Sequence, residues 1–433
     1  MKAILNRQKM KNRDLLERAK RVTPVASQTY SKSYRYFCGD FAPYFLEKGK
    51  GAYVWDVDGR KFTDYILALG PITVGYANDE VDNAIKNQLT NGISFSQSTE
   101  LEVQLAEKLV EIIPCAEQVR LVKNGSDATT GAIKLARAYT GKNHIAVCGY
   151  HGMHDWYIGS TNLNEGIPKA ICNLTHTFEY NDINSLKKIF TLYPNEIGAV
   201  ILEPIQGENP NVAFLKEVKR LTHSYKSVLI FDEVISGFRV ALGGAQELYG
   251  IIPDMASIGK GMANGMPLSA IVGKTKYLQL IEEGVFISTT FGGETLSIAS
   301  ALKTIEILSR ENSFKHIWEC ANLWFTEVKL LIETMQLDRY VKVVGEAPHS
   351  GLVFLDLNDD VKANDILSIY QDALMQEGIL SLGINNFCLS HSIEDVQFLI
   401  KITKNIFVKI QEIYAGKNKP LITKKIKPIF KRN

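Results

Sequence analysis

The sequence lacks the features that mark secreted, membrane-spanning and disulfide-stabilised proteins. Residues 1–20 are charged throughout and contain no apolar core of a signal peptide. No apolar run approaches the roughly 18 residues that a membrane-spanning helix needs. The six cysteines lie far apart and form no CxxC pair, so neither a zinc ribbon nor a disulfide framework is indicated. These absences predict a cytoplasmic protein.

An excess of charge of one sign is also absent from most of the chain. With 49 Lys and Arg against 47 Asp and Glu, the formal net charge is +2, which gives no general attraction to nucleic acid or membranes. The exception is the segment 416–433, which holds seven Lys or Arg and no acid. A solvated tail is expected there, and a weak contact with an anionic surface is the alternative. No P-loop or dinucleotide-binding motif follows a strand, so those nucleotide sites are excluded.

What the chain does contain is a series of short apolar runs separated by helical segments. Runs such as "IGAVILEPIQG" and "SVLIFDEV" alternate with helix-length stretches, which predicts βαβ units and a mostly parallel α/β sheet. Earlier in the chain, apolar and polar residues alternate around Asp58-Gly59, which predicts a hairpin. Later, a long helix, a strand and further helices indicate a smaller α+β domain. We therefore expect an N-terminal segment 1–50, a large domain 51–308, a small domain 309–415 and the tail 416–433.

Polar residues follow directly after the apolar runs. They are Asn124, Gly125, Ser126, Tyr150, His151, Gly152, Glu203, Asp232, Glu233 and Lys260. Because ligands of parallel α/β sheets bind beyond the carboxyl ends of the strands, these residues are expected to form one site. Lys260 stands between two glycines with no acid beside it, and a lysine in a closed pocket loses proton affinity and becomes nucleophilic. The carboxylate of Asp232, at the end of "LIFD", needs a cationic partner if it is buried.

A phosphorylated pyridine aldehyde would use each of these groups. Gly125 and Ser126 open a helix, whose N–H groups can hold a phosphate, although a simple N-cap explains Ser126 equally well. Tyr150 can lie flat on an aromatic cofactor, or it can be an ordinary core residue. Asp232 can pair with a protonated pyridine nitrogen, which makes the ring a better electron sink. Lys260 comes one strand–helix–strand unit later and can face the same ligand.

The segment "FDEVISGFRVALGGAQELYGIIPDMASIGKGMANGMPLSAIVG" resembles the cofactor segment of the class III aminotransferases, which depend on pyridoxal phosphate (PLP). "NGSDATTGAIKLARAYTG", "GYHG", "EPIQG" and "TTFGGET" also fall in that family's order. The likeness is greatest to the group around glutamate-1-semialdehyde 2,1-aminomutase and covers nearly the whole chain. It implies the type I PLP-dependent transferase fold, with a mostly parallel seven-stranded sheet in the large domain. It also implies a homodimer with active sites at the subunit interface.

The resemblance implies roles for individual residues. It assigns cofactor binding to Gly125, Ser126, Tyr150, His151, Glu203, Asp232, Val234, Lys260 and Thr290. Lys260 is implied to be the Schiff-base lysine and Asp232 the partner of the pyridine nitrogen, which makes these two the catalytic candidates. Val234 is implied to pack on the ring face opposite Tyr150. Thr290 is implied to reach the phosphate from the other subunit.

Some positions depart from the family's pattern. The Asn-Pro that commonly follows "TTFGG" is Glu294-Thr295 here, and the tryptophan that the aminomutase has before "GP" is Leu69. The aminomutase's N-terminal arginine, which binds the substrate carboxylate, is matched by Lys32, a point charge without the planar fork. Lys32 and Glu294 are the candidate substrate-binding residues, and a surface lysine is the alternative reading of Lys32.

The expected function is transfer of an amino group from an amino donor to a carbonyl substrate, through a Schiff base on Lys260 and pyridoxamine phosphate. The missing arginine and tryptophan favour this over the internal amino shift of glutamate 1-semialdehyde, which is the alternative. "FGGET" is loosely similar to family members of cell-surface polysaccharide or amino-sugar pathways. A sugar-derived or small aldehyde or ketone is therefore the expected acceptor.

Two further readings are open. A non-catalytic binding relative is the alternative from another class, and the retention of Lys260, Asp232 and the phosphate residues argues against it. A metal site at His151, His154 and Asp155 is not expected, because it would need a further ligand and helical geometry. The family pattern explains "YHG" better.

Overall fold

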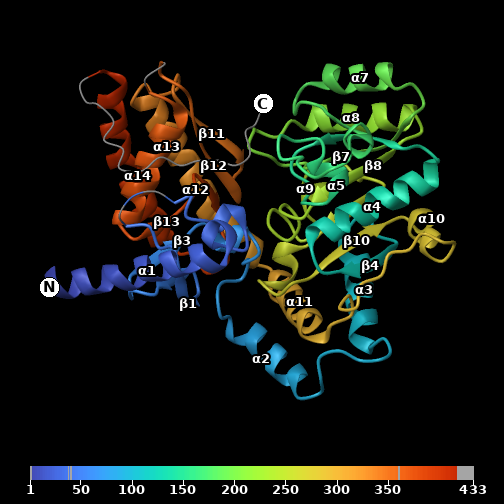
Figure 1. Ribbon diagram of the computed structural model, residues 1–433, viewed down its shortest axis with the longest axis horizontal. Coiled ribbons are helices and arrows are strands. Elements are labelled where there is room, and N and C mark those ends of the chain that lie inside the picture. The colour runs from blue at the N-terminus through green and yellow to red at the C-terminus, as the bar shows by residue number, and fades with distance from the viewer. Residues whose placement is uncertain (1, 38, 40, 359–360, 417–433) are drawn as a thin grey trace. The chain divides into compact units, whose positions relative to one another are not determined.

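The computed structural model describes residues 2–37, 39, 41–358 and 361–416, with side chains from residue 11 onward (Figure 1). Apart from Gly416, the expected basic tail lies outside the described residues. The described chain divides into two compact units. Unit 1 combines residues up to 69, residues 75–77 and residues from 315 onward, and unit 2 combines residues 70–74 and 78–314.

Unit 2 is built on a seven-stranded sheet. Its strands are β4 (Gln118–Val122), β5 (His144–Cys148), β6 (Thr175–Thr177), β7 (Ile197–Leu202), β8 (Val228–Glu233), β9 (Met255–Ile258) and β10 (Ser269–Gly273). They lie in the order β4-β10-β9-β8-β7-β5-β6. Neighbours pair in parallel except on the two sides of β10, which is antiparallel to β4 and β9. The predicted mostly parallel seven-stranded sheet is confirmed.

Helices pack on this sheet and on one another. They are α2 (Asp79–Leu89), α3 (Glu100–Ile112), α4 (Gly125–Thr140), α5 (Asp155–Ile158), α6 (Lys169–Cys172), α7 (Ile183–Leu192), α8 (Val212–Ser224), α9 (Ala245–Tyr249), α10 (Thr275–Leu278) and α11 (Thr295–Leu308), with 3₁₀ turns η4 (Lys260–Ala263) and η5 (Gln279–Ile281). Alternate strand residues such as Ile145, Ala199 and Ile230 pack with Ala132 and Leu135 of α4 in one core. Every residue of β7 and β8 is buried, as the continuous apolar runs require of strands covered on both faces.

Unit 1 contains two small sheets and the longest helices. Its elements are α1 (Lys2–Val22), η1 (Pro24–Ala26), η2 (Tyr30–Lys32), β1 (Leu46–Lys50), β2 (Tyr53–Asp56), β3 (Lys61–Asp64), η3 (Leu67–Leu69), α12 (Ser313–Thr334), β11 (Val341–Glu346), β12 (His349–Phe354), α13 (Ala363–Gln376), β13 (Ile379–Leu380), β14 (Ile384–Asn386) and α14 (Ile393–Tyr414). The sheet orders are β1-β2-β3-β13 and β11-β12-β14.

The predicted hairpin around Asp58-Gly59 is the β2–β3 pair. Its turn is fixed by Asp56, whose carboxylate accepts the N–H groups of Asp58 (3.0 Å) and Arg60 (2.8 Å). This hairpin belongs to unit 1 and not to the large unit, in which residues 51–69 were expected. The reason is that β3 pairs in parallel with β13 from the C-terminal part of the chain, through Thr63 with Ile379. Among the helices that the structure describes, none has the length and apolar character needed to cross a membrane.

Candidate active site

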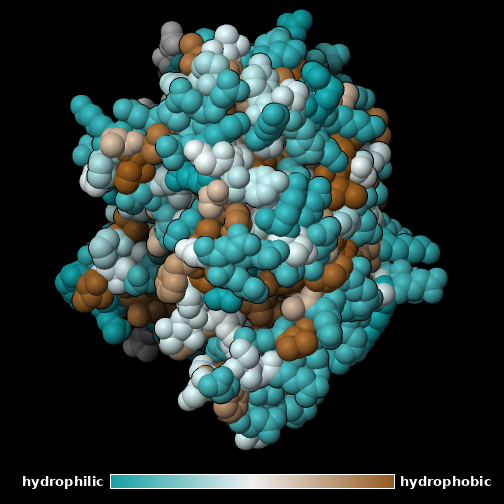
Figure 2. Space-filling view, turned by 90° about the vertical axis from the view of Figure 1, so that its right-hand side faces the viewer, coloured by the Kyte–Doolittle hydropathy of each residue, from teal (hydrophilic) through white to brown (hydrophobic). Residues whose placement is uncertain are grey.

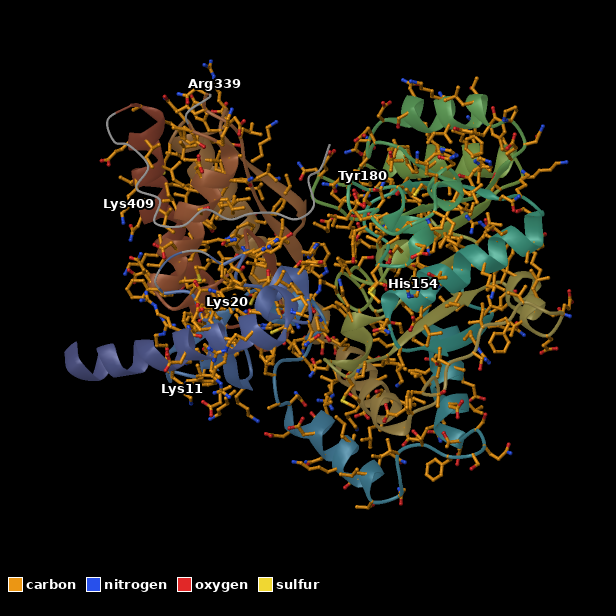
Figure 3. The ribbon with its side chains drawn as sticks, in the orientation of Figure 1. Lys11, Lys20, His154, Tyr180, Arg339 and Lys409 are labelled. Atoms are coloured by element: carbon orange, nitrogen blue, oxygen red, sulfur yellow. The ribbon has the colours of Figure 1, made fainter. Side chains whose placement is uncertain are left out.

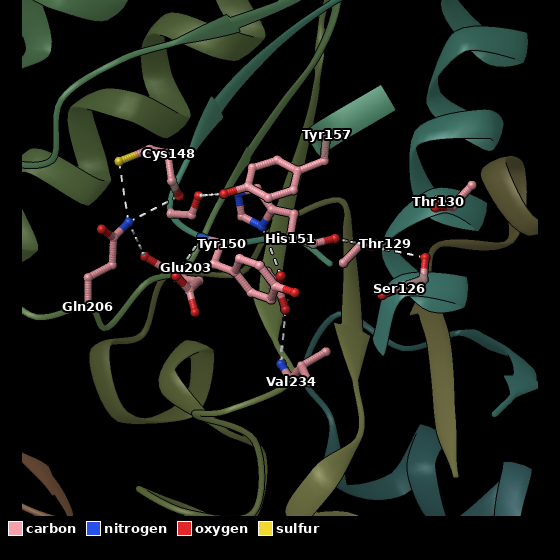
Figure 4. Close-up of polar contacts among 12 residues, drawn as sticks. Ser126, Thr129, Thr130, Cys148, Tyr150, His151, Tyr157, Glu203, Gln206 and Val234 are labelled. Carbon is pink, nitrogen blue, oxygen red and sulfur yellow. Dashed lines mark hydrogen bonds and ion pairs between the residues drawn. The ribbon is translucent and has the colours of Figure 1, made fainter. Parts of the chain in front are cut away.

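The carboxyl ends of the parallel strands in unit 2 bring together most of the predicted site residues (Figure 4). β5 ends before Tyr150 and His151, β7 ends before Glu203, and Asp232 is the second-last residue of β8. Because parallel strands end at the same edge of a sheet, their side chains converge there, as the sequence predicts.

Asp232 and His151 form the buried centre of this cluster. The Nδ1 atom of His151 lies 2.8 Å from one carboxylate oxygen of Asp232, and the other oxygen accepts the backbone N–H of Val234 at 3.2 Å. The two side chains are 0% and 5% exposed. The imidazole ring is held edge-to-face against Tyr157, whose hydroxyl donates to the carbonyl of Gly149. The carboxylate at the end of β8 therefore has a polar partner inside the protein, which offsets the cost of burying it.

Glu203 provides a second, half-buried carboxyl group that interacts with Asp232. One of its oxygens accepts the backbone N–H of Tyr150 at 2.9 Å. Burial raises the pKa of Glu203 to about 7, and the Asp232 carboxylate adds to this rise while His151 opposes it. The loop after β7 is also held by the buried Tyr180, labelled in Figure 3, whose hydroxyl donates to the carbonyl of Pro204 at 2.7 Å. These contacts fix Glu203 where the neighbouring ammonium group of Lys260 stabilises its charged form.

Lys260 is the cation that acts on these carboxylates. It opens η4 directly after β9 and is half-buried. Burial lowers the pKa of its ammonium group, and the positive charge of Arg239 lowers it further. The carboxylates of Glu203 and Asp232 raise this pKa but do not outweigh burial, so the net shift is downward. An amine whose pKa is lowered is more often deprotonated and nucleophilic at neutral pH. Lys260 also has a backbone φ of 39°, in the left-handed region that lysine rarely adopts.

The first turn of α4 lies against the same cluster. A Cβ added to Gly125 would come within 3.0–3.1 Å of the Val234 side chain, so the start of the helix packs directly on the residue after β8. The Ser126 hydroxyl oxygen accepts the N–H of Met153 at 3.1 Å. Asn124 caps the helix together with Asp127. The N–H groups of a first helical turn bind anions well, so this turn can hold a phosphate.

Two carboxylates and a threonine of the predicted set lie elsewhere in unit 2. Glu294 caps α11, where it accepts the N–H groups of Leu296 and Ser297 and pairs with Lys123 at 3.1 Å. Glu233, next to Asp232, points away from the site and caps α9. Thr290 is exposed in the loop before α11.

Lys32, the other candidate for substrate binding, lies in unit 1. It is exposed at the end of η2, and its charge helps to lower the pKa of the buried Asp64, which burial raises overall. His154, labelled in Figure 3 and weighed with His151 as a metal ligand, bonds through Nδ1 to the Thr130 hydroxyl at 2.8 Å. Among the described residues, no group of three or more His, Cys, Asp or Glu is arranged to hold a metal ion.

Several residues of this region carried no role in the sequence prediction. The Gln206 amide donates to the carbonyl of Cys148 at 3.0 Å and so ties the loop after β7 to the end of β5. Thr73 and Asn264 bond the segment 70–74 to the turn after Lys260. Arg239, in "SGFR", is 1% exposed. A charged residue flanked by apolar ones was the available signal for Arg239, whereas nothing local marks Thr73 or Asn264.

Comparisons with known proteins agree with this geometry. The sequence model of the family Aminotransferase class-III matches residues 38–394. The 3-aminobutyryl-CoA aminotransferase of Cloacimonas acidaminovorans is 36% identical over 92% of this chain and 97% of its own length. The glutamate-1-semialdehyde 2,1-aminomutase of Neisseria meningitidis serogroup C is 39% identical over 71% of this chain and 75% of its own length.

Solved structures show the same relationship. The PLP internal aldimine form of the FumI protein from Sphingopyxis sp. MTA144 superposes with a TM-score of 0.83 at 27% identity, over 94% of this chain and 98% of that one. An omega-transaminase from Sphaerobacter thermophilus superposes with a TM-score of 0.80 at 25% identity, over 92% of this chain and 97% of that one. The chain therefore belongs to the class III aminotransferases, and it is an enzyme that uses pyridoxal phosphate.

Proposed function

We propose that the protein is an aminotransferase that moves an amino group from an amino donor to a small carbonyl substrate, with Lys260 as the residue that binds PLP covalently. The observation that carries the proposal is the gathering of Lys260 with two carboxyl groups, the buried Asp232 and the half-buried Glu203, where the first turn of a long helix packs on Val234. This is the set of groups that a phosphorylated, positively charged pyridine aldehyde requires.

The described residues fit PLP at each of its polar parts. The first turn of α4, with Gly125 and Ser126, offers N–H groups and a hydroxyl for the phosphate. Asp232, kept in place by His151, offers a carboxylate for the pyridine nitrogen. Gly125 lies against Val234, so a ring that rests on Val234 would also lie close to the start of the helix. We assign the other ring face to Tyr150, which is 49% exposed.

Each residue then has a defined task in the reaction. Bound PLP would supply an electron sink, which makes it possible to remove the hydrogen from the carbon that bears the donor's amino group. Asp232 keeps the sink effective by holding a proton on the pyridine nitrogen, and His151 positions Asp232. With the donor's amine in its place on the cofactor, Lys260 Nζ would be free to accept this hydrogen as a proton and to deliver it to the carbon that carried the aldehyde, and its lowered pKa suits it to this role. Glu203, bonded to the Tyr150 N–H, favours the protonated form of Lys260.

The choice of transamination over the aminomutase reaction rests on the residues at the positions where the aminomutase group binds its substrate. An internal amino shift needs the substrate to be held at its carboxylate while the amino group changes carbon. The residues with which the aminomutase group does this, an arginine and a tryptophan, are matched here by Lys32 and Leu69. The similarity to 3-aminobutyryl-CoA aminotransferase over nearly the whole chain supports transamination as well. The aminomutase reaction is the second candidate, because several relatives carry that name.

The proposal also covers the identity of the two substrates and the residues that bind them. A sugar-derived or other small aldehyde or ketone, as in polysaccharide or amino-sugar synthesis, is the proposed acceptor, and an amino acid is the proposed donor. We propose Lys32 for the donor's carboxylate and Glu294 as a second candidate at the substrate. Since Glu294 already accepts hydrogen bonds from the start of α11, Lys32 is the stronger of the two.

We also propose a cytoplasmic homodimer in which Thr290 of one subunit completes the phosphate site of the other. Apolar side chains on either side of Thr290 support this, since Phe286 is 76% exposed and Phe291 is 57% exposed. Ile93 and Phe95 are also exposed, at 43% and 52%, and Ile93 is bonded to Thr295 just after this loop. Figure 2 views the side on which α10 lies in Figure 1 and shows apolar side chains exposed among hydrophilic ones. Exposed apolar groups of this size are typical of interfaces.

The decisive experiment is to incubate the purified protein with PLP, reduce it with borohydride and locate the added mass. We expect the mass on Lys260 and none in Lys260→Ala, which should fold and lose all turnover. Asp232→Ala should keep the attachment and lower the turnover by orders of magnitude. Absence of any covalent PLP in the wild-type protein would refute the proposal and support a non-catalytic relative.

The reaction type is tested with the pyridoxamine phosphate form of the enzyme. Keto-sugars and glutamate 1-semialdehyde are offered as acceptors, and 3-aminobutyryl-CoA and common amino acids are offered to the PLP form as donors. Return of the visible absorbance of bound PLP with a keto-sugar supports the proposal. Turnover of glutamate 1-semialdehyde to 5-aminolevulinate without an external donor would establish the aminomutase instead.

A further inference from the structure

We propose that Thr73, Asn264 and Arg239 are positioning residues of Lys260, which clamp the segment 70–74 onto the turn that carries the lysine and so hold its amine in place. The inference rests on the proposed role of Lys260. The segment, the turn and Arg239 all belong to unit 2. None of the three residues has a place among the groups assigned to cofactor or substrate above.

The turn needs such support because its backbone is strained. Lys260 has a φ of 39° and Asn264 a φ of 44°, so both ends of the turn are left-handed. Residues other than glycine persist in this region only where their surroundings over-determine it. Left to itself, the backbone would relax and move the side chain of Lys260 with it.

Two side chains bond the turn to the segment 70–74. The Thr73 hydroxyl donates to the carbonyl of Gly261 at 2.9 Å, directly after the lysine. At the far end of the turn, the Asn264 side-chain oxygen accepts the N–H groups of Thr73 at 3.0 Å and Val74 at 3.1 Å. Each bond joins residues far apart in the chain and fixes one end of the strained turn.

Packing between the two segments is as close as the bonding. A Cβ added to Gly261 would lie 2.8 Å from the Thr73 methyl carbon, and one added to Gly265 would lie 3.0 Å from Ile72. Thr73 is 1% exposed and Ile72 is 5% exposed. The segment therefore cannot approach or leave the turn without disturbing it.

Arg239 fixes the other end of the segment. Its side chain is buried, and its Nη2 atom donates to the carbonyl of Gly70 at 2.5 Å and to that of Ile72 at 3.4 Å. Burying a guanidinium group is costly unless it is hydrogen-bonded, and these two bonds through Nη2 tie the segment to Arg239. The charge of Arg239 also acts on Lys260, where it adds to the effect of burial and opposes the carboxylates of Glu203 and Asp232.

The test uses pairs of variants that separate this role from a general effect on stability. Thr73→Val keeps the shape and removes the hydroxyl, while Thr73→Ser keeps the hydroxyl. Asn264→Ala removes the acceptor of two N–H groups, and Asn264→Asp keeps it. Thr222→Val is the matched control, because Thr222 is fully buried and its hydroxyl donates to Val218 in α8.

The measured quantity is the rate at which the PLP-free protein attaches PLP covalently to Lys260, trapped by borohydride and read by mass. We expect Thr73→Val and Asn264→Ala to slow attachment on the order of 10-fold, and to lower kcat more than they change KM. Thr73→Ser and Asn264→Asp should largely restore the rate. Thr222→Val should lower the unfolding temperature and leave the rate unchanged.

A second measurement shows whether the effect passes through the lysine. In a Lys260→Ala background, Thr73→Val should leave the Kd of PLP unchanged, because the clamp then has no amine to position. Attachment rates of Thr73→Val and Asn264→Ala equal to those of the wild type or of Thr222→Val would overturn the proposal. Absence of attachment in the wild-type protein would instead refute the proposed function itself, so the two failures are distinguishable.

Discussion

Replacement of Lys123 by methionine measures how much the ion pair between Lys123 and Glu294 contributes to the stability of the protein. Lys123 directly precedes the helix cap Asn124, and its Nζ atom lies 3.1 Å from a carboxylate oxygen of Glu294. The two side chains are only 15% and 12% exposed. Glu294 caps α11 through the N–H groups of Leu296 and Ser297. The pair therefore joins the start of α4 to the start of α11.

The expected loss lies between the values for exposed and buried ion pairs. An exposed pair contributes about 0–1 kcal/mol to the free energy of unfolding, and removing one partner of a buried pair costs about 3–5 kcal/mol. Lys123→Met should cost about 2 kcal/mol, because Glu294 keeps the hydrogen bonds that cap α11. Glu294→Gln should cost about 1 kcal/mol, since an amide oxygen still accepts at the cap.

The assay is urea unfolding of the single variants and of the double variant Lys123→Met/Glu294→Gln, which form a double-mutant cycle. The double variant should recover part of the loss, because no unpaired charge remains. Lys108→Met is the control, since Lys108 pairs at 2.8 Å with Glu111 but the side chains are 33% and 66% exposed. It should cost less than about 0.5 kcal/mol. A loss in Lys123→Met no larger than this control, or a double variant that only adds the two single losses, would refute the reasoning.

The pH dependence of this pair has a definite sign. Burial acts to raise the pKa of Glu294, but the hydrogen bonds from Ser297 and Lys123 outweigh it and lower the pKa. A carboxyl group with a lowered pKa contributes stability above its unfolded pKa of about 4.3 and loses it as the pH falls through the folded value. The acid loss of stability should therefore be smaller in Lys123→Met than in the wild-type protein.

Three further predictions concern the site itself. Because burial raises the pKa of Glu203 to about 7, its native state binds a proton more tightly than the unfolded state, and the stability of the PLP-free protein should fall as the pH rises from about 4.3 toward 7. Glu203→Gln should flatten this slope in thermal unfolding, and an unchanged slope would contradict the assignment. Gly152→Ala should weaken PLP binding on the order of 10-fold in a titration, since its Cβ would lie 2.3 Å from the Ser126 hydroxyl oxygen; Gly166→Ala, with a similar positive φ but open space, is the control. Lys32→Ala should raise KM for amino acid donors several-fold and Lys32→Arg should partly restore it, whereas unchanged donor kinetics would direct the search to backbone N–H groups.

The sheet was predictable because its signal is local. Fully buried parallel strands read as continuous apolar runs, as in β7 and β8, and such runs separated by helices specify βαβ units. The order of the strands and the antiparallel direction of β10 leave no mark within a single strand. The same holds for residues 51–69, whose hairpin was predicted but whose unit depends on the pairing of Thr63 with Ile379.

The candidate site was predictable for a related reason. The end of an apolar strand is visible in the sequence, and this rule selects Asp232 and His151. In the structure, Nδ1 of His151 lies 2.8 Å from a carboxylate oxygen of Asp232. Thr73 and Asn264 were missed because a side chain that bonds to backbone 191 residues away leaves no periodicity or motif. For Glu294, the sequence shows an unusual residue, but its partner Lys123 lies 171 residues away and is brought to it only by the fold.

The division of the chain also has a consequence for the order in which the protein can form during synthesis. Unit 2 is almost continuous, from residue 78 to 314, so nearly all of it has left the ribosome before the last quarter of the chain exists. Unit 1 is split between the two ends of the chain, and more than 300 residues separate β3 from its partner strand β13. Contacts of such long sequence separation form late, because the intervening chain must first be closed into a loop. Once unit 2 has folded, residues 78 and 314 belong to one compact body, and the flexible chain that must be closed into a loop is much shorter. Prior folding of unit 2 therefore lowers the entropy cost of pairing the two ends of the chain.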